Sequence, residues 1–246
     1  MRIQDILTFL DTRAPFATAE EWDNPGLLVG SPSQPVNGIL VALDATPGAI
    51  ESALAIGANL IVTHHPVIFA PLRRLDGDSL PYRLAAAGIG LIAAHTNLDI
   101  AAGGVNDTLA ACLGLEDVTV APDGMSRIGR LPTPEESTAF ARQVAEALDT
   151  PVRVCGNREI RTVAVCGGGG GEFASALTGQ VDAFVTGEVK HHQWLEANAA
   201  GLTLIEAGHY ATEVPVVDTL CTWLQEAFPT LPVTPYRDGQ PYITVK

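Results

Sequence analysis

The sequence is poor in positive charge. Only 14 lysines and arginines stand against 28 aspartates and glutamates, and the formal net charge is −14 at pH 7. A protein that binds nucleic acid needs a basic surface to displace counterions, so the composition argues against a dedicated nucleic-acid binder. A small anionic ligand held by a local cluster of cations remains compatible with this charge.

Long apolar runs and clustered cysteines are also missing. No stretch approaches the roughly 18 consecutive apolar residues of a membrane span. The opening stretch, MRIQDILTFLD, carries acids early and predicts an amphipathic helix rather than a signal peptide. Cys112, Cys155, Cys166 and Cys221 are widely spaced and form no C-x-x-C pair. We therefore expect reduced thiols, no membrane insertion and a cytoplasmic location.

Short β-branched runs alternate with alanine-rich stretches along the whole chain. Apolar residues make up 47% of the sequence and charged residues 17%, which is a globular composition. The alternation is typical of an α/β protein. Strands with their exit loops are expected in 36–46, 160–171, 181–192 and 202–213, and strands in 59–66 and 89–99. Helices are expected in 47–58, 80–88, 134–149, 172–179 and 193–201.

The second half of the chain repeats the order of the first. Val-Thr-His-His at 62–65 overlays Val-Thr-Gly-Glu at 185–188, and Ala-His-Thr at 94–96 overlays Gly-His-Tyr at 208–210. We interpret this as a structural duplication, with a chance similarity between two ordinary α/β segments as the alternative. The segment 121–136 is rich in proline, glycine and charge, and is the expected break between the halves.

All six histidines follow predicted strands, at His64 and His65, His95, His191 and His192, and His209. In open α/β sheets, ligands bind beyond the carboxyl ends of the strands. Adjacent residues of a regular strand point to opposite faces, so His64 and His65 can address one site only where the backbone leaves the strand. Two neighbouring imidazoles at such a point suit two metal ions better than one.

Carboxylates recur at a fixed distance from two of these histidines. Asp99 lies four residues after His95, and Glu213 lies four residues after His209. Two neighbouring dications need anionic oxygens between them, and a mixed nitrogen and oxygen set suits Zn, Mn, Fe, Co or Ni. Three roles stay open for His95: a metal ligand, a proton shuttle, or a donor that orients Asp99.

Several further residues are weaker candidates. His95 and Glu188 are candidate proton carriers, because both follow strands near the expected ligands. Arg73, Arg74 and Lys190 could meet an anionic substrate, with a solvated surface role as the alternative. For His191 and His192, surface solvation and catalysis are equally compatible with the sequence.

The run CGGGGGE at 166–172 resembles a phosphate-binding loop only in part. Glu172 stands where a dinucleotide fingerprint has its third glycine, and no Gly-Lys-Ser/Thr follows. We expect a tight strand-to-helix turn with a close approach of the backbone to its neighbours.

Five stretches carry a resemblance to a known family: EWDNPGLLVG, VTHHPVIF, HTNLDIAAGGVNDTLA, DAFVTGEVKHH and EAGHYATE, spread over residues 21–213. The sequence resembles the NIF-three-like family, whose members are often described as GTP cyclohydrolase I type 2 homologues. The resemblance implies two intertwined, duplicated α/β repeats with mixed sheets flanked by helices. We expect the first repeat at 1–125, completed by 206–246, and the second at 126–205.

The resemblance also implies a function. It predicts toroidal homohexamers with two divalent metal ions per subunit, held by His64, His65, Asp99, His209 and Glu213. The implied reaction is hydrolytic opening of the purine ring of GTP or of a related small anionic substrate. The alternative is a non-enzymatic metal-binding regulator, or a protein of metal storage or delivery, that uses the same ligands.

Overall fold

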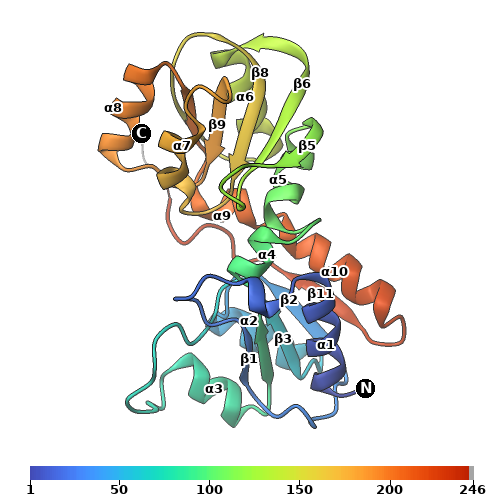
Figure 1. Cartoon of the computed structure of the whole chain (residues 1–246). Coiled ribbons are helices and arrows are strands. Elements are labelled where there is room, and N and C mark those ends of the chain that lie inside the picture. The colour runs from blue at the N-terminus through green and yellow to red at the C-terminus, as the bar shows by residue number, and fades with distance from the viewer. Residues whose placement is uncertain (244–246) are drawn as a thin grey trace. The chain divides into compact units, whose positions relative to one another are not determined.

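The computed structural model describes residues 1–243 and divides into two compact units. The first unit holds Met1–Ala102 together with the chain from Val216 onward, and the second holds Gly103–Pro215. The chain leaves the first unit once and returns to it, so the blue N-terminal elements and the red C-terminal helix of Figure 1 belong to one unit.

The first unit is built on a five-stranded mixed sheet in the order β1-β4-β3-β2-β11. β1 pairs antiparallel with β4, and all other pairs are parallel. The three inner strands are buried along their whole length, as expected for parallel strands covered on both faces. The strands are β1 (Gly26–Val29), β2 (Ile39–Ala42), β3 (Leu60–Thr63), β4 (Gly90–Ala93) and β11 (Val233–Tyr236).

Helices flank this sheet. The α2 helix begins where the sequence predicts: the Thr46 hydroxyl accepts a hydrogen bond from the Ala49 N–H, and Pro47 occupies the first helical position. Ile50 of α2 and Leu84 of α3 pack in one apolar core with Ile61 and Leu91 of the sheet. The helices are α1 (Ile3–Arg13), η1 (Phe16–Thr18), α2 (Pro47–Ala55), α3 (Leu80–Ala86), α4 (Thr96–Ile100) and α10 (Val216–Ala227).

The second unit contains a six-stranded mixed sheet in the order β5-β6-β8-β9-β10-β7. The β8-β9 and β9-β10 pairs are parallel, and the other pairs are antiparallel. Its strands are β5 (Glu116–Val120), β6 (Arg127–Glu136), β7 (Arg153–Cys155), β8 (Glu159–Cys166), β9 (Ala183–Thr186) and β10 (Thr203–Glu206). Its helices are α5 (Val105–Cys112), α6 (Ser137–Ala147), η2 (Gly170–Phe173), α7 (Ala174–Leu177), α8 (His191–Ala200) and α9 (His209–Glu213).

The two sheets share one pattern. In each, three strands that follow one another along the chain lie parallel, and an antiparallel strand pairs with the last of them: β1 with β4, and β7 with β10. Thr63 and Thr186, which the sequence overlay matches, each end the middle strand of their set. The expected α/β class with two duplicated mixed sheets flanked by helices is confirmed.

The repeat boundaries stay a prediction, because a compact unit need not coincide with a duplicated segment. The expected break at 121–136, however, contains β6, which pairs with both β5 and β8. Pro132 and Pro134 fall where the register of β6 against β8 shifts, between Arg130 and Glu135. An irregular stretch tolerates residues that have no N–H to donate, so the prolines do not end the strand.

The expected strand over 89–99 is too long. β4 ends at Ala93, and Thr96–Ile100 forms the short helix α4. Among the described residues, no helix is both long and apolar enough to cross a lipid bilayer.

Candidate metal centre

Three imidazoles gather at the carboxyl edge of the first unit's parallel strands. His64 and His65 follow β3, and His95 follows β4. The ring centroid of His64 lies 4.8 Å from that of His65 and 5.1 Å from that of His95. The centroids of His65 and His95 are 5.5 Å apart. One nitrogen from each ring lies within 4.8 Å of the other two. The structure thus brings together three histidines that the sequence placed at two separate strand ends.

Each of these rings is oriented by an acceptor on its Nδ1 side. The Nδ1 atom of His64 lies 2.9 Å from the Ala94 carbonyl oxygen, and that of His65 lies 2.8 Å from Oδ1 of Asp44. A carbonyl or carboxylate oxygen can only accept, so Nδ1 carries the proton. The Nε2 atom of each ring then presents the lone pair that a metal ion requires.

Asp23 is the acceptor that orients His95 in the same way. Its Nδ1 atom lies 2.8 Å from Oδ1 of Asp23, whose other oxygen accepts from the Thr96 N–H at 3.0 Å and from the Thr96 hydroxyl. Burial raises the pKa of Asp23, but the hydrogen bonds from His95, Thr96 and Asn24 outweigh burial and lower the pKa from 3.8 to about 2. Asp23 is therefore ionised at neutral pH and fixes the tautomer of His95.

Asp99 joins the group from the short helix α4. Its Oδ1 lies 3.8 Å from Nε2 of the fully buried His64. The helical turn that begins at His95 explains the spacing of four residues between His95 and Asp99, because residues four apart in a helix share one face.

The second unit carries a smaller group with the same local design. His209 and Glu213 are four residues apart on α9, and Nε2 of His209 lies 3.1 Å from Oε2 of Glu213. The Nδ1 atom of His209 lies 3.2 Å from Oε1 of Glu188, which follows β9. Glu213 is buried, whereas the Glu188 side chain is 64% exposed.

The glycine-rich run packs against His209 and Glu213. Gly168 has a φ of +59°, and a Cβ on it would overlap the carboxylate of Glu213 and stand 3.2 Å from Nε2 of His209. Its N–H donates to the Thr212 hydroxyl at 3.0 Å. The expected close approach of the backbone is thus observed. The group that lies against the backbone is the side chain of Glu213, a candidate metal ligand.

Gly187 explains why the second repeat lacks a counterpart of His64. A Cβ there would lie 2.5 Å from the Gly168 carbonyl oxygen and 2.8 Å from the Cα of His209. No side chain fits at this position, so only the first repeat can carry a histidine at it.

The donors fit a divalent transition metal. Imidazole nitrogens held by partners on their far side, together with carboxylate oxygens, are the ligands that zinc, iron, manganese, cobalt and nickel accept in proteins. Sequence reasoning missed the orienting residues Asp23 and Asp44. A usable signal exists for Asp44, which is the second residue after β2 and lies at the same edge as His65.

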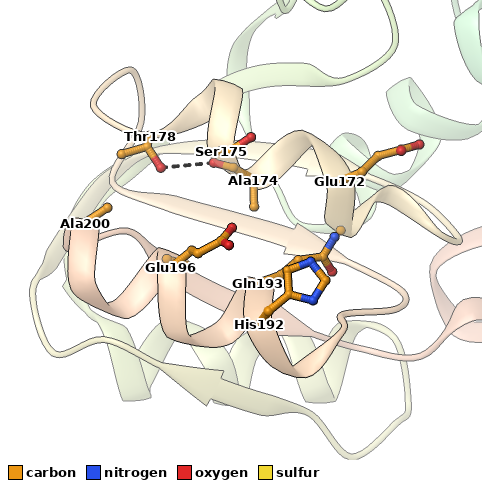
Figure 2. Close-up of a pocket in the computed structure, with 10 residues that line it drawn as sticks. Glu172, Ala174, Ser175, Thr178, His192, Gln193, Glu196 and Ala200 are labelled. Atoms are coloured by element: carbon orange, nitrogen blue, oxygen red, sulfur yellow. Dashed lines mark hydrogen bonds between the residues drawn. The ribbon is translucent and has the colours of Figure 1, made fainter.

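The other sequence candidates lie elsewhere. A cavity of about 500 Å³ opens between α7 and α8 in the second unit, lined by Glu172, His192 and Glu196 (Figure 2). His191 starts α8 and is exposed, as are Arg73 and Arg74 in the loop before α3.

A second cavity of about 340 Å³ shares Glu172 with the first. Its lining adds Glu188, Glu206 and Lys190. Among the described residues that line these two cavities, Lys190 is the one cation beside several carboxylates. These cavities therefore disfavour anionic ligands.

Known proteins are similar to this chain over most of its length. The family model for Duf34/NIF3 (NGG1p interacting factor 3) matches residues 1–238. A Lactococcus lactis protein described as a GTP cyclohydrolase 1 type 2 homolog is 34% identical over 222 residues, which is 85% of this chain and 86% of that protein. A Streptomyces coelicolor protein with the same description is 37% identical over 234 residues, which is 87% of this chain and 82% of that protein.

Solved structures agree. The crystal structure of a hypothetical protein from Staphylococcus aureus has 30% sequence identity and a TM-score of 0.93, with 100% of this chain and 99% of that chain covered. The resemblance drawn from the five motif stretches is confirmed: the chain belongs to the DUF34/NIF3 family.

Proposed function

We propose that this protein is a dinuclear metal-dependent hydrolase that opens the purine ring of GTP or of a related small anionic substrate. The observation that carries the proposal is the orientation of His64 and His65, whose Nδ1 atoms face acceptors, so that Nε2 carries the lone pair that a metal ion requires. The description of two relatives as GTP cyclohydrolase 1 type 2 homologs supports the substrate class.

The proposed ligands come from both groups. They are three imidazoles and two carboxylates: His64, His65, Asp99, His209 and Glu213. We propose that they hold two divalent ions per chain, drawn from Zn, Fe, Mn, Co and Ni. The family resemblance and the local design of each group support this assignment.

In this proposal, side chains of the protein would take up and release the protons of the reaction. The bound ions would act as Lewis acids that lower the pKa of water and polarise the substrate. Asp23 holds the Nδ1 proton of His95, so Nε2 is the atom at which His95 takes up and releases a proton. Glu188 is the second candidate carrier, and its contact with Nδ1 of His209 also suits it to orient that ligand.

A metal-storage, metal-delivery or regulatory protein is the second candidate. It is favoured by the acidic lining of the two cavities, in which Lys190 is the one lysine or arginine among the described lining residues. The same five ligands would serve, and no proton carrier would be required.

Assembly and location are part of the proposal. The family resemblance supports a toroidal homohexamer, which sedimentation or light scattering can test. The wide spacing of the four cysteines, without a C-x-x-C pair, supports a cytoplasmic location.

Elemental analysis of protein purified without chelator tests the metal site. We expect about two transition-metal ions per chain and a clear loss of metal in a His64→Ala/His65→Ala variant. The matched control is His191→Ala/His192→Ala, which removes two exposed histidines from α8. Equal metal content in the two variants would contradict the proposal.

Turnover separates the two candidates. Metal-loaded protein is incubated with GTP, one metal at a time, and the purine absorption spectrum is followed. We expect ring opening that depends on His95, with His95→Gln retaining metal but losing turnover. If the protein holds its full metal content but consumes neither GTP nor any compound of a broad metabolite screen, the hydrolase proposal fails. The metal-storage, metal-delivery or regulatory protein then becomes the favoured function.

A further inference from the structure

Two large aromatic side chains are exposed beside the histidine group of the first unit. Trp22 is 58% exposed and Phe69 is 54% exposed. Their ring centroids lie 5.6 Å apart with the planes tilted by 37°. Exposed aromatic pairs of this kind forgo the free energy that burial would release, so they often mark a binding surface.

The pair borders His95. The His95 ring centroid lies 6.0 Å from that of Trp22 and 6.2 Å from that of Phe69, and both arrangements are edge-to-face. A flat molecule resting on the pair would therefore have an edge next to His95.

Partly buried hydrogen bonds hold both aromatic segments in place. On one side of Trp22, the Glu20 N–H donates to the Thr96 hydroxyl at 3.0 Å. On the other side, Asp23 is bonded to His95 and Thr96. The Asn24 side chain donates to the Ile68 carbonyl oxygen at 2.6 Å, which ties this segment to the residue before Phe69.

This anchoring distinguishes the pair from an incidental surface patch. The residues on either side of Trp22 are fixed, while its ring stays in solvent beside a group that can transfer a proton. A ligand that stacks there loses little free energy to ordering the protein, because the surface is already arranged.

We propose that Trp22 and Phe69 form a stacking platform for a planar heteroaromatic ring, such as a nucleobase, and present its edge to His95. This inference rests on the proposed function and adds the residues that would select a ring-bearing substrate. The aromatic faces supply affinity for any flat π-system, and the hydrogen-bonding groups around His95 supply orientation.

Binding of guanosine, adenosine and ribose 5-phosphate tests the platform. Calorimetry or ligand-observed NMR compares the full-length protein with Trp22→Ala and Phe69→Ala. We expect each variant to bind both nucleosides about 5- to 100-fold more weakly and ribose 5-phosphate unchanged. Trp22→Phe keeps a ring and should restore most of the affinity. Leu75→Ala removes an apolar side chain of similar exposure, 56%, and should leave nucleoside binding unchanged.

Metal content is measured on every sample, and binding is also measured on metal-stripped protein. Loss of nucleoside affinity in Trp22→Ala at unchanged metal content supports the platform even if no hydrolysis is found. Equal nucleoside affinity in the native protein and both alanine variants overturns it. The platform is also overturned if Trp22→Ala changes only the oligomer mass measured by sedimentation. The aromatic pair would then be a contact between copies of the chain.

Discussion

The backbone of Gly168 lies directly against the carboxylate of Glu213, and no β-carbon fits between them. Gly168 also has a φ of +59°, a conformation that residues with a β-carbon adopt at a cost of about 1–2 kcal/mol. One glycine thus sets both the turn after β8 and the position of a proposed metal ligand.

Gly168→Ala should therefore disturb the proposed ligand pair of the second unit, His209 and Glu213. We expect a loss of about 1–3 kcal/mol in the free energy of unfolding and a lower metal content, because Glu213 must move. Gly169→Ala is the matched control, since a Cβ at Gly169 meets nothing within 4 Å. Denaturant titration and elemental analysis of both variants check the prediction. Metal content as high in Gly168→Ala as in Gly169→Ala would refute the assignment of Glu213.

Asp44 should support metal binding without touching the metal. Its carboxylate holds the Nδ1 proton of His65, so Asp44→Asn frees that ring to rotate or to change tautomer. Loss of such a partner commonly lowers metal affinity about 10- to 100-fold. Competition with a chromogenic chelator measures the affinity, and Asp78→Asn, in the exposed loop before α3, is the control. Equal affinities would show that Asp44 has no part in the site.

The inner strands and the positions of the histidines were predictable from the sequence. Apolar β-branched runs such as Ile61–Thr63 carry a local signal for buried strands, and the histidines directly follow them. The α4 helix was not predictable in the same way. Thr96–Ile100 spans little more than one turn, which is too short for a helical period to emerge.

The orienting residues were missed for a different reason. Asp23 and His95 are 72 positions apart in the sequence, and no local pattern links them. They meet because β1 runs antiparallel to β4, with Gly26 opposite Ala93, so the chain before β1 reaches the carboxyl edge of β4. Contacts of this kind follow from strand order, which composition and spacing do not encode.

The segment 121–136, which contains β6, yields a test of its own. Its Arg127 is almost fully buried in the second unit and donates from Nε to Oδ1 of Asp107 at 2.5 Å. Asp107→Ala removes this carboxylate from the buried guanidinium of Arg127 and should cost about 3–5 kcal/mol. An Asp107→Leu/Arg127→Met double variant should cost less, since no charge is left buried. Chemical denaturation measures both, and a single variant within about 1 kcal/mol of the native protein would contradict the argument.

Asp182 should make the stability of the second unit depend on pH. Its Oδ2 accepts hydrogen bonds from the Arg161 N–H at 3.0 Å and from the Thr162 N–H and hydroxyl, both at 2.8 Å. Burial raises the pKa of Asp182, but these hydrogen bonds outweigh burial and lower the pKa below 3.8. Because the folded state favours the ionised carboxylate, its contribution is complete well above pH 4 and is lost as the pH falls through the lowered pKa.

The Asp182→Asn variant measures that contribution. At pH 7 we expect it to be about 1–3 kcal/mol less stable than the native protein, because a neutral amide is a weaker acceptor for three donors. The difference should shrink as the pH falls below 4, where Asp182 becomes protonated in the native protein as well. Denaturant titrations at several pH values give both curves, and Glu146→Gln on the exposed side of α6 provides the baseline. A stability difference that stays constant from pH 7 to pH 3 would show that the carboxylate charge is not what the donors stabilise.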